Sequence, residues 1–167
     1  MKPLDLHQAH PQYFKALPIP QLIHLESGKF IAIEGHGPAG TKEMSTRLKT
    51  LYPVASRIKQ YYKAKGKDFV IPQLESDWWS NNRKPINQVP HDERLWKLMI
   101  RLPEFVEPNV VEQAKKDVIM QNRVISALWV SLYSESVHDA VQMLHVGPWS
   151  REPETIKKIY KFIKRNS

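Results

Sequence analysis

Two short segments of this chain resemble each other, and they constrain its fold more than any other feature. Each consists of an expected β-strand, a histidine, a Gly-Pro pair and an amphipathic helix; the first includes Ile33-Glu34-Gly35-His36-Gly37-Pro38 and the second Leu144-His145-Val146-Gly147-Pro148. Gly37 and Gly147 lie 110 positions apart. This spacing is too long for a solenoid repeat and is typical of a duplicated supersecondary unit packed about a pseudo-two-fold axis.

The first junction leads into the clearest helix of the sequence. Thr41 fits its N-cap, Gly66 fits its C-terminal stop, and Pro53 is expected to kink it or to remove one backbone hydrogen bond. Apolar residues recur in steps of three and four, the spacing of one helical face. They are Met44, Leu48, Leu51, Ala55, Ile58 and Tyr62.

β-Strands are expected on both sides of this helix. Alternating residues and bounding turn residues predict a hairpin before it and two strands after it, the first at an edge position because of Pro72. The hairpin strands are Gln21–Glu26 and Lys29–Glu34, and the later strands are Asp68–Glu75 and Arg94–Arg101, with a polar loop at Ser76–His91.

The second part of the chain repeats some of this order. Pro108 fits the first turn of a second helix, and a second hairpin and a third helix from about Pro153 are expected after it. The expected buried residues are Val111, Ala114, Val118 and Met120 in the second helix, and Ile156, Ile159, Tyr160 and Ile163 in the third. The hairpin strands are expected at Val124–Tyr133 and His138–Val146.

This order predicts an α+β fold, with a single domain over residues 1–167. It is expected to consist of two pseudo-symmetric βαββ-type halves, at about 19–105 and 106–167, with antiparallel sheet and the helices on one side. No strand is expected after the third helix, so the second half is truncated relative to the first. Because an open strand edge pairs readily with another chain, we expect a homodimer through this edge, or an isolated monomer of low stability.

Composition excludes several classes of protein. The chain has no cysteine, which excludes disulfides, thiolate metal sites and thiol nucleophiles. No apolar run approaches the ~20 residues needed to span a bilayer, and the N-terminus has no signal-peptide pattern, so we expect a cytoplasmic protein outside the membrane. The net charge of +8 is spread along the chain without a nucleic-acid-binding signature, which argues against direct binding of nucleic acid.

Motifs for a cofactor or a catalytic nucleophile do not occur. The sequence has no P-loop, dinucleotide fingerprint or nucleophile elbow, and its seven histidines do not have metal-ligand spacing. We therefore expect no metal and no cofactor. Acid–base catalysis by one carboxylate and a water stays open, although most such glutamates are solvated surface residues. The candidates are Glu34, Glu75, Glu104 and Glu152.

Aromatic residues give the strongest indication of a binding site. Trp78 and Trp79 are adjacent in the expected polar loop, shortly after Glu75. Such a pair predicts a platform for a flat ligand, with the carboxylate attracting cations; alternatively, one Trp closes the core under the loop. Trp96 and Tyr133, on nearby expected strands, would add further walls.

Four segments, in order, resemble the GyrI-like small-molecule-binding domain family, in particular its stand-alone branch. They are Leu74-Glu75 with Trp78-Trp79, Met99–Val106, Gln142–Trp149 and Glu152–Ile156, within a resemblance from about Phe30 to Lys164. It implies a cytoplasmic bacterial domain of two pseudo-symmetric βαββ units with an aromatic cleft for bulky hydrophobic, often cationic compounds. Relatives serve as effector domains of multidrug-responsive regulators, as gyrase-inhibiting proteins, or as hydrolases that open the cyclopropane ring of DNA-alkylating toxins.

Two departures from the family pattern weaken the hydrolase interpretation more than the binding one. The family's C-terminal strands, which normally supply a pocket glutamate, have no counterpart, and Trp149 stands where the family has tyrosine. We expect sequestration or sensing of a lipophilic small molecule; the alternatives are a hydrolase of cyclopropanoid toxins and a protein-interaction role through the open sheet edge. The expected ligand-binding residues are Glu75, Trp78, Trp79, Trp96, Tyr133, His145 and Trp149, with His145 otherwise making local hydrogen bonds.

Overall fold

The structure, a computed structural model, describes residues 2–82 and 84–166 and contains two compact units. Unit 1 comprises Gly28–Glu135 with the first residues of the chain up to Leu6. Unit 2 comprises His7–Ser27 and the chain from Ser136 onward. The two units therefore do not coincide with the halves expected from the sequence, because each unit takes segments from both.

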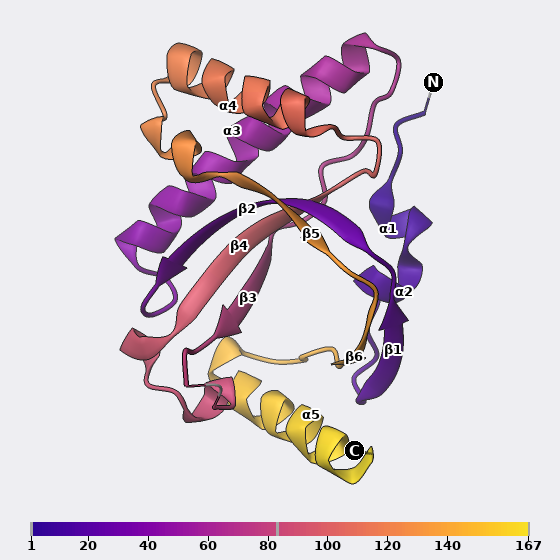
Figure 1. Ribbon diagram of the computed structural model, residues 1–167. Helices are drawn as coiled ribbons and strands as arrows, with labels where there is room; N and C mark the ends of the chain where they lie inside the picture. The colour runs from indigo at the N-terminus through magenta and orange to yellow at the C-terminus, as the bar shows by residue number, and fades with distance from the viewer. Residues whose placement is uncertain (1, 83, 167) are drawn as a thin grey trace. The chain divides into compact units, whose positions relative to one another are not determined.

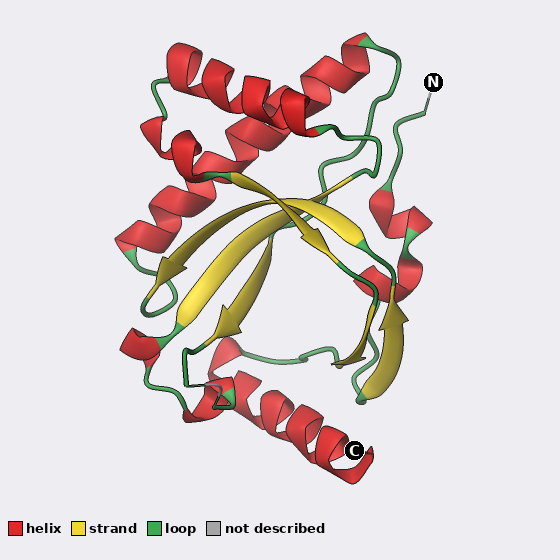
Figure 2. Cartoon of the chain, in the orientation of Figure 1, coloured by secondary structure: helices red, strands yellow, loops and turns green. Residues whose placement is uncertain are grey.

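Unit 1 is built on a four-stranded antiparallel sheet with the strand order β3-β4-β2-β5. The strands are β2 (Gly28–His36), β3 (Glu75–Trp79), β4 (Leu95–Leu102) and β5 (Ser131–Glu135). Two helices, α3 (Lys42–Ala64) and α4 (Pro108–Asn122), cover one face of this sheet (Figures 1 and 2). Three short 3-10 helices complete the unit, η1 (Ile86–Gln88), η2 (His91–Glu93) and η3 (Ile125–Trp129). The predicted α+β class is confirmed.

The core of unit 1 lies between the sheet and the two helices. Alternate residues of the central strands β2 and β4 contribute Ile31, Ile33, Trp96, Leu98, Ile100 and Leu102. The helices contribute Leu51, Val54, Ala55, Ile58 and Tyr62 from α3 and Val110, Val111, Ala114 and Val118 from α4. The helical stripe predicted for α3 is thus confirmed, with Met44 and Leu48 packed at its partly buried end.

The ends of α3 follow the sequence prediction. The backbone N–H of Met44 donates to Oγ1 of Thr41 at 3.2 Å, which makes Thr41 the N-cap. Gly66 follows the helix with φ of +75°, a conformation that glycine adopts without steric cost. The helix continues through Pro53, so the loss of one backbone hydrogen bond does not end it.

The strand expected at Asp68–Glu75 is wrong. Phe69 makes an isolated β-bridge to Leu4, and of the expected segment only its last residue, Glu75, belongs to a strand, as the first residue of β3. Pro72 has no backbone N–H and so cannot donate to a ladder. The segment expected to be a polar loop supplies most of β3, which pairs with Leu95–Met99 of β4.

Both expected hairpins are also wrong. The two strands of the first exist, but most of the strand expected at Val124–Tyr133 is the 3-10 helix η3, and the strand expected at His138–Val146 ends at Gln142. β1 (Gln21–Leu25) pairs with β6 (His138–Gln142), whereas β2 pairs with β4 and β5. The β1–β6 and β2–β5 ladders share one register. Gly28 pairs with Glu135, and Leu25, three residues before Gly28, pairs with His138, three residues after Glu135. Gly28 already belongs to β2, so Ser27-Gly28 is not a tight turn.

Unit 2 contains the two-stranded β1–β6 sheet, helix α2 (Pro11–Phe14), the 3-10 helix η4 (Trp149–Arg151) and helix α5 (Glu152–Asn166). Helix α1 (Leu6–Ala9) spans the boundary between the units. The third helix is confirmed as α5, but its expected buried stripe is wrong, because no residue of α5 is buried. Two strands offer too little apolar surface to form a second core.

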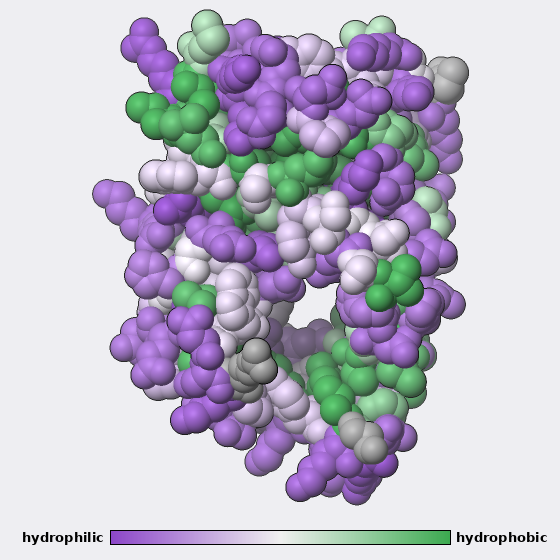
Figure 3. All heavy atoms as spheres, in the orientation of Figure 1, coloured by the Kyte–Doolittle hydropathy of each residue, from purple (hydrophilic) through white to green (hydrophobic). Residues whose placement is uncertain are grey.

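Hydrophobic side chains are also exposed at the end of α4. Figure 3 shows hydrophobic surface at the upper left, where α4 leads into η3. Met120, expected in the buried face of α4, is 80% exposed, and Ile125 and Leu128 are exposed beside it in the sequence. Among the helices of the described residues, none combines the length and the hydrophobicity that a membrane span requires.

Candidate functional site

The candidate functional site is the face of the four-stranded sheet opposite α3 and α4, which we call the open face. Side chains alternate between the faces of a strand. Since Trp96, Leu98 and Ile100 belong to the core, their neighbours on β4 lie on the open face, and the strand register places the residues of the other strands. The open-face residues are Glu75, Asp77 and Trp79 on β3; Leu95, Lys97, Met99 and Arg101 on β4; Phe30, Ala32, Glu34 and His36 on β2; and Ser131, Tyr133 and Glu135 on β5.

One end of the open face is buried and the other is accessible. At the buried end, Phe30, Met99 and Arg101 have at most 3% of their surface exposed. The Arg101 guanidinium lies 5.9 Å from the ring centroid of Phe30. At the other end, the side chain of Glu34 is 63% exposed and Trp79 is half-buried. A ligand would therefore meet the end formed by β3, Lys97 and Glu34.

Lys97 occupies the centre of the accessible end. Its Nζ lies 3.8 Å from the ring centroid of Tyr133 and 5.6 Å from that of Trp79, which are cation–π distances. The same atom is 3.4 Å from Oε1 of Glu34, and the register places Asp77 directly opposite Lys97 on β3. The side chain of Lys97 is only 14% exposed. Two aromatic rings and the Glu34 carboxylate therefore lie near one ammonium group, with Asp77 paired to Lys97 across the strands.

The open face is more acidic than the chain as a whole. It carries two basic side chains, those of Lys97 and Arg101, besides the imidazole of His36. Its acidic side chains are Glu34, Glu75, Asp77 and Glu135. The excess of carboxylates contrasts with the net charge of +8 of the full sequence. This local charge favours cations near the aromatic rings.

Three of the predicted site residues, Glu75, Trp79 and Tyr133, share the open face. Trp78 lies on the opposite face, because it is the neighbour of Trp79 on a strand and pairs with Trp96 of the core face. It packs partly buried against the core. The expected platform formed jointly by Trp78 and Trp79 is therefore wrong.

Trp96 is also not a wall of an accessible site. It is completely buried in the core of unit 1. Its six-membered ring packs onto the backbone of Gly35, where an added Cβ would overlap the ring atoms. The absence of a side chain at Gly35 thus creates the space that Trp96 fills.

His145 and Trp149 belong to unit 2. His145 donates from Nε2 to the carbonyl oxygen of Pro148 at 3.1 Å, and its Nδ1 lies 2.8 Å from Oγ1 of Thr155. The local hydrogen bonding expected as an alternative for His145 is therefore confirmed: it connects the Gly-Pro junction to α5. Trp149 is 77% exposed, and its ring lies 5.8 Å from that of His145.

The other candidate acids fall into two groups. Glu34 and Glu75 lie on the open face, whereas Glu104 and Glu152 are exposed residues outside it. Within the described residues, no group of three or more His, Asp or Glu side chains has the arrangement of a metal site.

Sequence reasoning missed the central role of Lys97. Its position was predictable, since the alternation of β4 places Lys97 on the other face of the sheet from Trp96 and Leu98. A charged residue inside an otherwise apolar strand also indicates a possible functional position. Its partners Tyr133 and Glu34 come from strands distant in sequence, so only the tertiary structure identifies them.

Comparisons with known proteins identify a shared fold. No protein-family model matches the chain, and neither does any curated protein. A crystal structure of an uncharacterized conserved protein from Listeria innocua matches with a TM-score of 0.87 at 27% identity, covering 98% of this chain and 81% of that one. Two crystal structures of hydrolases from Listeria innocua match at 27% identity with TM-scores of 0.84 and 0.85, over 98% and 99% of this chain and 84% and 82% of theirs.

Proposed function

We propose that this chain binds a bulky aromatic small molecule, preferably a cation, at the accessible end of the open face. The observation that carries the proposal is the position of the Lys97 ammonium group, 3.8 Å from the ring of Tyr133 and beside that of Trp79. A protein that stabilises its own cation at this point offers the same aromatic surfaces and carboxylates to a ligand. The biological role would be sequestration or sensing of such a compound, as the GyrI-like resemblance implies.

The arrangement also implies that a cationic ligand would compete with the Lys97 ammonium for the ring of Tyr133. A cationic ligand has to displace the ammonium of Lys97 from Tyr133, whereas Glu34 and Asp77 remain to neutralise either cation. Removal of the ammonium should therefore strengthen the binding of cations. The same substitution should have little effect on a neutral aromatic ligand that binds by stacking alone.

The test is a titration of the protein with a planar cationic dye, ethidium. The wild type is compared with single variants on the paired strands β3 and β4. Trp79→Ala should weaken binding by about 1–3 kcal/mol, because it removes a stacking surface. Lys97→Met should strengthen it. Trp78→Ala is the matched control, since Trp78 is adjacent in sequence but lies on the other face, and should leave the affinity unchanged.

Two outcomes would overturn this proposal. One is the absence of saturable dye binding to a protein whose circular dichroism is that of a folded α+β domain. The other is an equal loss of affinity in the Trp78 and Trp79 variants, which would indicate general destabilisation instead of a ligand contact on the open face.

A second candidate function is hydrolysis, which two observations favour. Structures named as hydrolases share the fold over nearly the whole of this chain at 27% identity. The open face also carries half-buried carboxylates, Glu75 and Asp77, either of which could take a proton from water as the water attacks a strained electrophilic ring. Relatives implied by the GyrI-like resemblance open the cyclopropane ring of DNA-alkylating toxins.

A turnover assay distinguishes hydrolysis of a ligand from binding without turnover. The assay follows loss of a cyclopropane-containing substrate by mass spectrometry, with addition of one water to the product. Hydrolysis predicts loss that is abolished in Glu75→Gln or Asp77→Asn while dye binding persists. Stable substrate in the presence of wild-type protein that binds the dye would leave binding as the function.

A further inference from the structure

A groove lies at the end of unit 1 where β5 begins. Its volume is about 360 Å³, and it is lined by Glu34, Arg47, Trp129 and Ser131. Ser131 is the first residue of β5 and pairs with Ala32, whereas β2 continues past Glu34 to His36. The residues just before β5 form η3 and do not extend this ladder. The end of the ladder thus leaves space beside the exposed carboxylate of Glu34.

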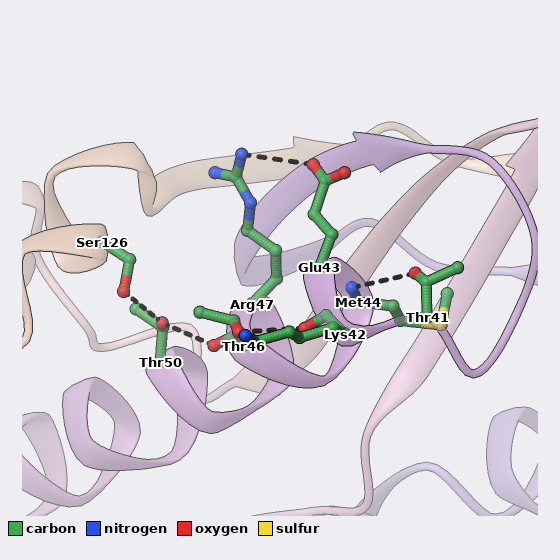
Figure 4. Close-up of polar contacts among 8 residues, drawn as sticks. All are labelled: Thr41, Lys42, Glu43, Met44, Thr46, Arg47, Thr50 and Ser126. Atoms are coloured by element: carbon green, nitrogen blue, oxygen red, sulfur yellow. Dashed lines mark hydrogen bonds and ion pairs between the residues drawn. The ribbon is translucent and has the colours of Figure 1, made fainter.

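The wall formed by η3 is fixed against α3. Oγ1 of Thr50 and Oγ of Ser126 lie 2.6 Å apart, and Figure 4 shows this contact joining the two helices. Ala127 and Val130, on either side of Trp129, are buried in the core, whereas Trp129 itself is 60% exposed. The indole is therefore held by a rigid backbone and presents its surface to solvent.

The groove lining carries two opposite charges, those of Arg47 and Glu34. The Arg47 guanidinium lies 4.0 Å from the ring centroid of Trp129. Arg47 and Glu43 project from the same side of α3, and Nη2 of Arg47 is 3.5 Å from Oε1 of Glu43 (Figure 4). Oε1 of Glu34 is 3.4 Å from Nζ of Lys97. Both ion pairs are longer than the ~2.7–2.9 Å of a strong charge-assisted hydrogen bond, so both charged groups retain capacity for a ligand.

We propose that this groove binds a small zwitterion that carries an aromatic group, the chemistry of an aromatic α-amino acid. The ligand carboxylate pairs with Arg47, its ammonium pairs with Glu34, and its ring packs on Trp129. The Ser131 hydroxyl supplies a further hydrogen-bonding group. The volume is at the small end of the range for ligand pockets, roughly 300–1,000 Å³, which fits a single amino acid.

This inference goes beyond the proposed function and does not depend on it. Its ligand is recognised by Arg47 and Trp129, neither of which belongs to the open face, and it needs two opposite charges where the open face favours a cation. The groove shares Glu34 and Ser131 with the open face, and Glu34 also contacts Lys97. Trp79→Ala should therefore leave binding of the zwitterion unchanged.

The experiment is an NMR titration of the full chain with L-phenylalanine, following the five indole N–H signals, among which Trp129→Phe identifies that of Trp129. The Trp129 signal should shift and saturate. N-acetyl-L-phenylalanine, which lacks the ammonium, and phenethylamine, which lacks the carboxylate, should each bind at least about tenfold more weakly.

Variants test the two charged groups separately. Arg47→Gln and Glu34→Gln should each weaken phenylalanine binding by about tenfold or more. Lys42→Gln removes a cation from the same helix outside the groove and should have no effect. The proposal is overturned if phenylalanine does not shift the Trp129 signal, if the two variants bind it as the wild type does, or if N-acetyl-L-phenylalanine binds equally well.

Discussion

At the scale of single residues, the absence of a side chain at Gly35 determines where the large side chain of Trp96 packs. A Cβ at Gly35 would overlap the indole of Trp96, which is completely buried. The pairing register places the two residues directly opposite each other on β2 and β4. A tryptophan that the sequence suggests as a ligand contact is therefore a core residue.

We expect Gly35→Ala to lower the free energy of unfolding by about 1–3 kcal/mol, since overpacking forces side chains and backbone apart. Chemical denaturation measures the change. The double variant Gly35→Ala/Trp96→Leu should lose less than the sum of the two single variants, because the smaller side chain releases the overlap. Additive losses would contradict a steric origin.

At the scale of elements, polar contacts fasten α3 to its neighbours. Lys59 Nζ donates to Oδ1 of Asp68 at 2.7 Å, and the Tyr61 hydroxyl donates to Oδ2 of Asp117 on α4 at 2.7 Å. The hydrogen bond from Lys59 holds the pKa of Asp68 below its usual 3.8, and the hydrogen bond from Tyr61 does the same for the pKa of Asp117. Both contacts depend on an ionised carboxylate.

These lowered pKa values predict a loss of stability in acid. The stabilisation is complete above the ordinary carboxyl pKa of 3.8 and is lost as the pH falls below it, because the unfolded chain takes up protons first. The free energy of unfolding, measured by denaturant titration at a series of pH values, should therefore decrease through this range. The variant Asp68→Asn/Asp117→Asn should have a smaller slope; an unchanged slope would assign the acid sensitivity to other groups.

At the scale of the whole molecule, the core is distributed unevenly. All buried hydrophobic residues among the described positions belong to unit 1, from Leu6 to Val130 in sequence, and unit 2 contributes none. Since burial of apolar surface supplies most of the free energy of folding, unit 2 has much less to stabilise it.

Hydrogen exchange should reveal this difference. We expect the amides of α5 to exchange through low-energy local opening, and those of α3 near Leu51 and Ile58 to exchange only with global unfolding. Mass spectrometry of peptides from the two helices measures both. Equal protection of α5 and α3 would contradict this expectation, because it would show that unit 2 is as stable as unit 1 without buried apolar residues of its own.

Self-association through an open strand edge, expected from the sequence, remains a prediction. Within the described residues, β6 pairs with β1 alone, so the sheet of unit 2 has two edges. The mass measured by light scattering should rise with protein concentration. Ile163→Lys, which alters the exposed face of α5 and leaves the strands intact, should not prevent this. A monomeric mass at all concentrations, together with high thermal stability, would exclude the prediction.

The sequence by itself determined the local structure of this chain. The apolar stripe of α3, its Thr41 cap, the Pro108 start of α4 and the alternation of β4 were all predictable, because periodicity and capping depend on residues close in sequence. The Trp79 and Glu75 components of the candidate site were predictable for the same reason, as residues of one segment.

Only the tertiary structure decided which strands pair and which residues meet. β1 and β2 have the sequence of a hairpin but pair with distant strands, because longer ladders and a shared core outweigh a two-residue turn. Lys97 meets Tyr133 and Glu34, and Arg47 meets Trp129, through that pairing and through the packing of α3. Such long-range contacts leave no periodic trace in a sequence, so the positions of the site and the groove followed from the fold alone.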